Sequence, residues 1–280
     1  MTDRKLPKRI FADAAQEAEQ AKLSTLTSPQ TDHPAYRLAF QDAEFLLRED
    51  LRPVRFQLEL LKPELLLDEA KIGSTFVFYG SARIPEPGVA ATVDDPKIAK
   101  SLEAKSHYYA EARKLAQLVS VIPADKDGLR QFVVCSGGGP SIMEAANRGA
   151  TDVGVSSIGL NIVLPHEQAP NPYVTPGLSF QFHYFALRKM HFLLRARAVA
   201  VFPGGFGTFD EMFELLTLIQ TGKIKPMPVL LFGKDFWNRV VNFQALVDEG
   251  VVSAADLDLI HFVESAEEAW DIARQFYPVA

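Results

Sequence analysis

Two glycine-rich loops, SGGGPS at 136–141 and PGGFGT at 203–208, hold the residues with the clearest potential for chemistry. Each follows a short apolar run and leads into a stretch with helical periodicity. Because glycine has no Cβ, an anion can approach the backbone N–H groups at such a helix start, where the helix dipole also favours negative charge. The first loop is neither a Walker A nor a GxGxxG sequence, and an ordinary turn with a helix cap is its alternative. Together the two loops indicate a phosphate-bearing small molecule, with a nucleotide as the natural candidate.

A third, weaker loop is YGSAR, in which a hydroxyl at Ser81 and a guanidinium follow a glycine. An ordinary turn explains this pattern more often than a ligand contact does. The glutamates after the two stronger loops also have two interpretations. Thr208 with Glu211, and Ser141 with Glu144, fit the S/T-x-x-E capping box, in which the glutamate satisfies helix N–H groups. Capping and catalysis can coexist in one residue, so both remain open for Glu211.

The stretch FALRKMHFLLR at 185–195 predicts a basic helix. At about 100° per residue, one face carries Arg188, His191 and Arg195. Another face is apolar and carries Leu187, Met190 and Leu194. We expect the apolar face to dock on a sheet and the basic face to point to solvent or to the site. A solvated basic face is the usual alternative, but this helix leads straight into the strand before the second glycine loop, which favours Arg188 as a site residue.

From residue 74 onward, short apolar runs alternate with longer helical stretches. The runs predict strands at 75–79, 132–135, 158–164, 198–202 and 229–232. The stretches predict helices at 101–120, 141–150, 185–195, 208–221, 236–249 and 266–276. Such alternation predicts an α/β class: a Rossmann-like, doubly wound, mostly parallel sheet with helices on both faces. Ligands bind such sheets outside the carboxyl ends of the strands, where the glycine loops lie.

The part before this domain has a different pattern. Residues 1–33 are polar, and we expect at least the first several to be disordered. Residues 34–73 predict a helical extension of two or three helices, with Pro53 and Pro63 as breaks or starts. The predicted organisation is therefore a polar segment, a helical extension and a nucleotide-binding catalytic domain at 74–280.

Composition excludes several classes of function. The chain has 280 residues and a net charge of −6, which argues against charge-driven binding to nucleic acid. No apolar run is long enough to cross a membrane, and the first residues lack the apolar core of a signal peptide. The lone Cys135 cannot form an intrachain disulfide, so a reducing cytoplasm is the expected location. The six histidines form no metal-ligand pair, and we expect no metal.

Two motifs resemble a known family. PGGFGT with Glu211 matches PGGxGTxxE, and Arg188-Lys189 matches the Arg-Lys pair upstream of it. The chain resembles the LOG ("Lonely guy") family, the cytokinin riboside 5′-monophosphate phosphoribohydrolases long mislabelled as lysine decarboxylases. The resemblance covers about 74–276, and the preceding helical segment is similar to that of the longer bacterial branch. The family's RKxxM pattern would require methionine where this chain has Phe192, and SGGGPSIMEAANRGA replaces a common Gly-Met-Gly run.

The resemblance implies a catalytic pair, Arg188 and Glu211. It also implies that the 5′-phosphate binds at Gly204, Gly205, Gly207 and Thr208. The other two loops and the basic helix add further expected substrate contacts, namely Ser81, Gly137, Gly138, Gly139, Arg188 and Lys189. The implied reaction is hydrolysis of the N-glycosidic bond of AMP or an N6-modified cytokinin nucleotide, giving free base and ribose 5-phosphate. The expected partners are this nucleotide and further copies of the chain, because the resemblance implies a homodimer or higher homo-oligomer.

No cofactor is expected for this hydrolysis. A lysine decarboxylase would need pyridoxal phosphate on a Schiff-base lysine, and the sequence supports no such arrangement, since Lys189 fits better as a phosphate or ribose contact. A non-catalytic nucleotide-binding or molybdenum-cofactor-carrier-like protein is the main alternative. A binder of that kind would not need both Arg188 and Glu211. An NAD-dependent dehydrogenase is weaker still, because no GxGxxG follows the first strand.

Overall fold

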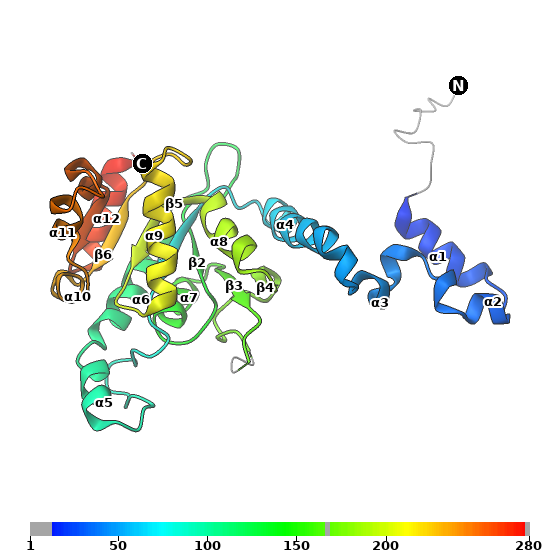
Figure 1. Cartoon of the computed structure of the whole chain (residues 1–280), viewed down its shortest axis with the longest axis horizontal. Helices are drawn as coiled ribbons and strands as arrows, with labels where there is room; N and C mark the ends of the chain where they lie inside the picture. Colours follow the sequence, from blue (N-terminus) through cyan, green and yellow to red (C-terminus); the bar gives the residue numbers. More distant parts are fainter. Residues whose placement is uncertain (1–12, 166–168, 278–280) are drawn as a thin grey trace. The chain divides into compact units, whose positions relative to one another are not determined.

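The computed structural model describes residues 13–165 and 169–277. The chain divides into two compact units, Met1–Leu58 and Glu59–Ala280. The expected disorder of the first several residues lies outside the described part. The first unit contains α1 (Ala14–Ser24), α2 (Pro29–Asp32) and α3 (Ala43–Leu46), and two short 3₁₀ turns lie between α2 and α3 (Figure 1).

Helix α4 (Arg52–Glu69) begins in the first unit and ends in the second. Pro53 is its second residue, which agrees with its expected role as a helix start, because the missing N–H is not needed there. Pro63 was expected to break or start a helix, but α4 runs through it. Pro63 is buried and lacks an N–H, so the carbonyl of Glu59, four residues earlier, has no intrahelical donor.

The second unit contains one seven-stranded sheet in which every neighbouring pair is parallel (Figure 1). Its spatial order is β4-β3-β2-β1-β5-β6-β7. The strands are β1 (Thr75–Tyr79), β2 (Val133–Ser136), β3 (Ile158–Ile162), β4 (Ser179–Phe182), β5 (Ala196–Val201), β6 (Val229–Phe232) and β7 (Ile260–Val263). All five predicted strands are present. The two that sequence did not predict, β4 and β7, are short edge strands, and their polar residues interrupt the apolar pattern.

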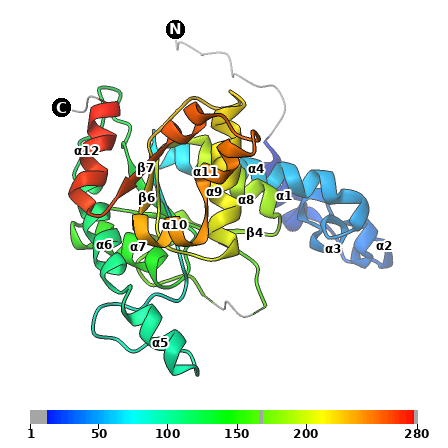
Figure 2. The same ribbon diagram turned by 60° about the vertical axis from the view of Figure 1, so that its left-hand side comes forward.

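Helices cover both faces of the sheet (Figure 2). One face carries α6 (His107–Ser120), α7 (Ile142–Asp152) and α12 (Ala266–Phe276), and the other carries α8 (Phe185–Leu194), α9 (Phe206–Gln220), α10 (Lys234–Val240) and α11 (Phe243–Asp248). The predicted helix 101–120 is two helices, α5 (Pro96–Glu103) and α6, and the predicted helix 236–249 is α10 and α11. Asp95 and Asn242 cap the first turns of α5 and α11, respectively. The α/β, doubly wound prediction is confirmed.

Burial in the core explains why the strands have apolar sequences. Side chains alternate between the two faces of the sheet, so Phe76 and Phe78 of β1 pack with α6 and α7. Tyr79 points to the opposite face, where its ring centre lies 5.1 Å from that of Phe192. Every residue of β1, β2 and β6 is buried. Strands buried on both faces read as continuous apolar runs.

The strand order also locates the site. From β1 the chain proceeds to one side of the sheet through β2, β3 and β4, then returns through α8 to β5 on the other side of β1. The connections after β1 and β5 therefore diverge, and sheets of this kind bind ligands outside the carboxyl ends of the strands at such a point. The loops after β1, β2 and β5 are the three that the sequence singled out.

Candidate active site

Arg188 lies in the second turn of α8 and is held on three sides. Its Nε donates to the carbonyl oxygen of Leu160 in β3 at 2.6 Å, and its Nη1 lies 3.4 Å from Glu211 Oε1. Its guanidinium carbon stands 5.1 Å from the centre of the Phe192 ring. Only 11% of the Arg188 side chain is exposed. The guanidinium is therefore fixed in one orientation beside a carboxylate.

The faces of α8 differ from the sequence expectation. Met190 and Leu194 of the predicted apolar face are 46% and 41% exposed, whereas His191 of the predicted basic face is buried. Arg195 forms ion pairs with carboxylates of α4. The prediction of one apolar and one basic stripe is wrong because two other elements cover α8. The sheet contacts it at Phe192, and the middle of α4 contacts it at His191.

Glu211 lies in the second turn of α9 with its side chain 14% exposed. Burial raises the pKa of its carboxyl from 4.5 to about 7, and the Arg188 guanidinium opposes part of that rise. The capping interpretation fails, because α9 begins at Phe206 with Gly205 as its N-cap and no side chain caps it. Thr208 is therefore the third residue of the helix rather than its cap. A carboxyl group that titrates near neutral pH can both accept and release a proton during a reaction.

The wall beside this pair is apolar and neutral. Tyr79, the last residue of β1, is buried, and burial followed by the charge of Glu211 raises the pKa of its phenol well above 10.0. Burial also raises the pKa of the Cys135 thiol in β2. Both groups stay protonated at neutral pH, so Cys135 is not a nucleophile. The Arg188–Glu211 pair is the charged centre of a low-dielectric site.

The first glycine loop packs directly against this centre. A Cβ on Gly137 would lie 2.6 Å from Arg188 Nη2 and 2.8 Å from the sulfur of Met143. Gly138 has a positive φ of 73°, and a Cβ there would overlap the side-chain amide of Asn161. The backbone conformation and the packing at 138 therefore favour glycine, whereas a side chain at 137 would displace the Arg188 guanidinium or the Met143 sulfur.

A buried asparagine network, which the sequence analysis missed, holds the same loop. The Asn171 backbone N–H donates to the carbonyl oxygen of Gly138 at 2.8 Å, and its Nδ2 donates to that of Gly139 at 3.0 Å. Asn147 of α7 joins the network by accepting from Ser136 Oγ at 2.7 Å and from Asn171 Nδ2 at 2.9 Å. A polar residue on the alanine-rich face of α7 was the available signal for Asn147.

The second glycine loop contains both packed and open positions. A Cβ on Gly204 would overlap the side chain of Thr208, which is itself buried. In contrast, a Cβ on Gly205 or Gly207 would have no neighbour within 4 Å. Phe206 between them is 97% exposed. The first turn of α9 therefore presents open backbone on which an anion could lie.

The loop after β1 joins the other two loops. Ser81 N donates to the carbonyl oxygen of Pro203 at 3.1 Å, and Ile142 N donates to that of Ser81 at 3.4 Å. Ser141 Oγ donates to the carbonyl oxygen of Ile84 instead of capping α7. Ser81 thus lies between the starts of α7 and α9.

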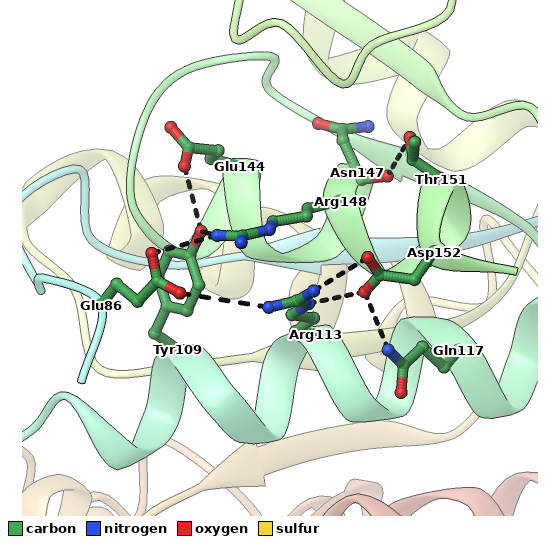
Figure 3. A network of polar contacts seen from close by, with 9 residues as sticks. All are labelled: Glu86, Tyr109, Arg113, Gln117, Glu144, Asn147, Arg148, Thr151 and Asp152. Atoms are coloured by element: carbon green, nitrogen blue, oxygen red, sulfur yellow. Dashed lines mark hydrogen bonds and ion pairs between the residues drawn. The ribbon is translucent and has the colours of Figure 1, made fainter.

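A polar network on the far side of α7 anchors this loop (Figure 3). Glu86 accepts from Arg148 Nη1 at 3.0 Å and lies 4.0 Å from Arg113 Nη1. Glu144 accepts from Tyr109 OH at 3.0 Å, so the predicted cap by Glu144 is also wrong. Helices α6 and α7 and the loop after β1 are therefore connected through charged groups.

Lys189 forms two ion pairs with α9. Its Nζ lies 3.2 Å from Asp210 Oδ1 and 3.4 Å from Glu214 Oε2, both on α9. These ion pairs join α8 to α9 next to the Arg188–Glu211 pair. A contact between Lys189 and a substrate stays a prediction.

Two kinds of site are not found in the part of the chain that the structure describes. No group of three or more His, Cys, Asp or Glu side chains there is arranged to hold a metal ion. No described helix combines the length and the apolar character needed to cross a membrane.

Comparison with known proteins identifies a matching family model and several similar sequences. Residues 143–273 match a family model described as possible lysine decarboxylase. LOG2 of Arabidopsis thaliana, named a cytokinin riboside 5′-monophosphate phosphoribohydrolase, is 27% identical over 150 residues, which cover 52% of this chain and 68% of the relative. A pyrimidine/purine nucleotide 5′-monophosphate nucleosidase of Escherichia coli (strain K12) is 26% identical over 163 residues, which cover 53% of this chain and 34% of the relative.

Among solved structures, the molybdenum cofactor (Moco) carrier protein of Chlamydomonas reinhardtii aligns with 73% of this chain and 98% of its own, at 18% identity and a TM-score of 0.43. The fold assignment rests on the strand order described above. The matched segment 143–273 contains Arg188, Lys189 and the PGGFGT loop with Glu211. The resemblance to the LOG family is therefore confirmed, over the part of the chain that these matches cover.

Proposed function

We propose that this protein hydrolyses the N-glycosidic bond of nucleoside 5′-monophosphates, AMP or an N6-modified nucleotide, to free base and ribose 5-phosphate. The observation that carries the proposal is the buried pair Arg188–Glu211, 3.4 Å apart, with the Glu211 pKa raised to about 7 at the carboxyl ends of the central strands. The names of LOG2 and the bacterial nucleosidase support this reaction type.

In the proposed mechanism, Glu211 acts at the anomeric carbon. As the C1′–N bond breaks, the electron pair leaves with the base and C1′ becomes electron-poor, as in other glycoside hydrolyses. The ionised Glu211 carboxylate stabilises this charge and accepts a proton from the water that attacks C1′. A new C1′–O bond forms, the departing base takes up a proton from water, and Glu211 returns the proton that it accepted to solvent.

Arg188 and the glycine loops position the substrate in this proposal. The 5′-phosphate binds at the open first turn of α9, at Gly205, Gly207 and Thr208, where backbone N–H groups and the helix dipole favour an anion. Arg188 lowers the pKa of Glu211 against the effect of burial, which favours the carboxylate, and it contacts the ribose. Binding energy from the phosphate thus places C1′ against Glu211.

The remaining expectations belong to the same proposal. The reaction requires neither a cofactor nor a metal, and Ser81, Gly137, Gly138, Gly139, Lys189 and Gly204 line the substrate. The protein works in the cytoplasm as a homodimer or higher homo-oligomer. Residues 74–280 form the catalytic domain, and residues 34–73 are its helical extension.

The test is chromatographic detection of free base and ribose 5-phosphate after incubation with a panel of nucleoside monophosphates that includes isopentenyl-AMP. Wild type, Glu211→Gln and Arg188→Ala are compared with Glu249→Gln, an exposed glutamate outside the site. We expect base release by wild type and the control, and its loss in both site variants. Nucleotide binding without cleavage by wild type would refute hydrolysis and favour a non-catalytic nucleotide-binding protein.

A further inference from the structure

Residues 59–72, which comprise the second half of α4 and the chain up to β1, contact α8 at both ends and in the middle. We call them the 59–72 segment. Helix α8 carries Arg188, so whatever fixes α8 also fixes the guanidinium. The contacts are made by side chains and backbone of both partners, and they lie within the unit Glu59–Ala280.

At the start of α8, the carboxylate of Glu59 substitutes for a helix cap. Its Oε1 accepts from the backbone N–H of His183 at 2.9 Å and its Oε2 from that of Tyr184 at 3.2 Å. Tyr184 is the N-cap residue of α8, and its own side chain makes no capping hydrogen bond. A carboxylate at this place also interacts favourably with the helix dipole. Glu59 therefore satisfies donors that α8 leaves open.

In the middle of α8, the backbone of the same residue makes a second contact. His191 Nε2 lies 3.1 Å from the carbonyl oxygen of Glu59, and His191 is 5% exposed. This carbonyl is free for His191 because Pro63 has no N–H to donate to it. The proline inside α4 thus leaves an acceptor available for a hydrogen bond between α4 and α8.

At the end of α8, Arg195 completes the attachment. Its Nη2 donates to Glu64 Oε2 at 2.9 Å and to Asp68 Oδ1 at 2.8 Å, and its Nη1 donates to the carbonyl oxygen of Ile72 at 2.6 Å. Arg195 is the C-cap residue of α8. The helix is consequently fixed at its first turn, on its buried face and at its last residue.

We propose that Glu59 is a positioning residue for Arg188. Glu59 holds the backbone of Tyr184, and the Tyr184 carbonyl oxygen accepts the Arg188 N–H at 3.1 Å, so one hydrogen-bonded turn connects the two residues. The guanidinium must fit between Gly137 and Glu211, where a small movement of α8 would separate it from the carboxylate. The kinetic part of this inference rests on the proposed function.

The test compares Glu59→Ala and Glu59→Gln with Glu69→Ala. Glu69 is the last residue of α4, is exposed, and its side chain forms no hydrogen bond or ion pair with the described residues. Glutamine keeps the chain length and one acceptor oxygen, so it is the variant to use if alanine does not fold. For each protein we would measure kcat, KM and the pH dependence of kcat/KM. The ionisation of Glu211 would be followed separately by ¹³C NMR, with the signal assigned by its loss in Glu211→Gln.

We expect Glu59→Ala to lower kcat about tenfold or more with KM changed less than about twofold, because misplacing a catalytic group acts on the transition state. Glutamine should restore part of the rate, and Glu69→Ala should match wild type. The Glu211 pKa should rise in Glu59→Ala, since Arg188 lowers it in the intact site. Unchanged kcat and unchanged Glu211 ionisation in a folded Glu59 variant would overturn the inference. If wild type cleaves no nucleotide, the proposed function fails, and the NMR titration still decides the role of Glu59.

Discussion

Replacing Glu211 by glutamine should stabilise the fold at alkaline pH while it removes the proposed activity. A free glutamate has a pKa near 4.5, and burial raises that of Glu211 to about 7. The folded state therefore retains a proton that the unfolded chain loses between these two pH values. Stability falls as the pH rises through this window, and the full cost is present above pH 7. Glutamine has the same shape and never ionises.

The magnitude follows from the pKa difference. Each pH unit between the two pKa values corresponds to about 1.4 kcal/mol, so ionisation of Glu211 costs about 3 kcal/mol at pH 8 and about 1 kcal/mol at pH 5. The Glu211→Gln variant should gain about 2 kcal/mol over wild type between these two pH values. The pKa of Glu211 already includes its attraction to Arg188, so that attraction is not counted again. In the variant, the Arg188 guanidinium keeps its hydrogen bond to the carbonyl oxygen of Leu160.

Urea unfolding at pH 5 and pH 8 measures this difference, with tryptophan fluorescence as the signal. Trp237 and Trp270 are both buried in the unit that contains the site. Glu249→Gln serves as the control, because removing an exposed carboxylate should leave the pH dependence as in wild type. An equal change in the free energy of unfolding from pH 5 to pH 8 for wild type and Glu211→Gln would show that Glu211 does not have a raised pKa.

Three further predictions concern other parts of the structure. Gly137→Ala should push the Arg188 guanidinium away and lower kcat about 100-fold in a steady-state assay. Gly205→Ala should fold normally and mainly raise KM, because its added Cβ projects into open space at the proposed phosphate position. Asn147→Ala should lower the free energy of unfolding in urea by about 1–3 kcal/mol, since it leaves buried hydrogen-bond partners unsatisfied. Burial lowers the pKa of His191 below 6.5, so its contribution to stability is complete above that value and lost as the pH falls. Unfolding curves of His191→Gln should depend less on pH between 5 and 7 than those of wild type.

The sequence identified Arg188 and Glu211, which the structure brings together, but not the contacts around them. Arg188 and Glu211 could be found because their motifs are local and stand next to strand-to-helix loops. The strands β1 and β6 could be placed to the residue because both faces are buried, which makes them continuous apolar runs. The edge strand β4 alternates polar and apolar residues over only four positions, and β7 mixes them, so the signal was too short to separate these strands from loops.

Long-range contacts account for the errors. His191 lies at a position that periodicity assigned to a basic face, but a helix more than a hundred residues earlier in the chain covers it. Pro63 was expected to interrupt or start a helix. The carbonyl oxygen of Glu59 that Pro63 leaves without a helix donor instead lies within hydrogen-bonding distance of His191. Ser141 and Glu144 fit a capping box, but both side chains have partners in other elements, at Ile84 and Tyr109. Pairings across such separations leave no trace in a local pattern.

The exposed ring of Phe206 makes the loop after β5 suitable for an optical reporter. The chain has two tryptophans, both buried, so their emission reports the protein interior. Phe206 is 97% exposed and stands between two glycines whose Cα atoms face open space. A Phe206→Trp substitution would add one solvent-exposed fluorophore at the first turn of α9 without filling a packed volume. Its red-shifted emission would then signal ligand arrival in real time, with no need for turnover.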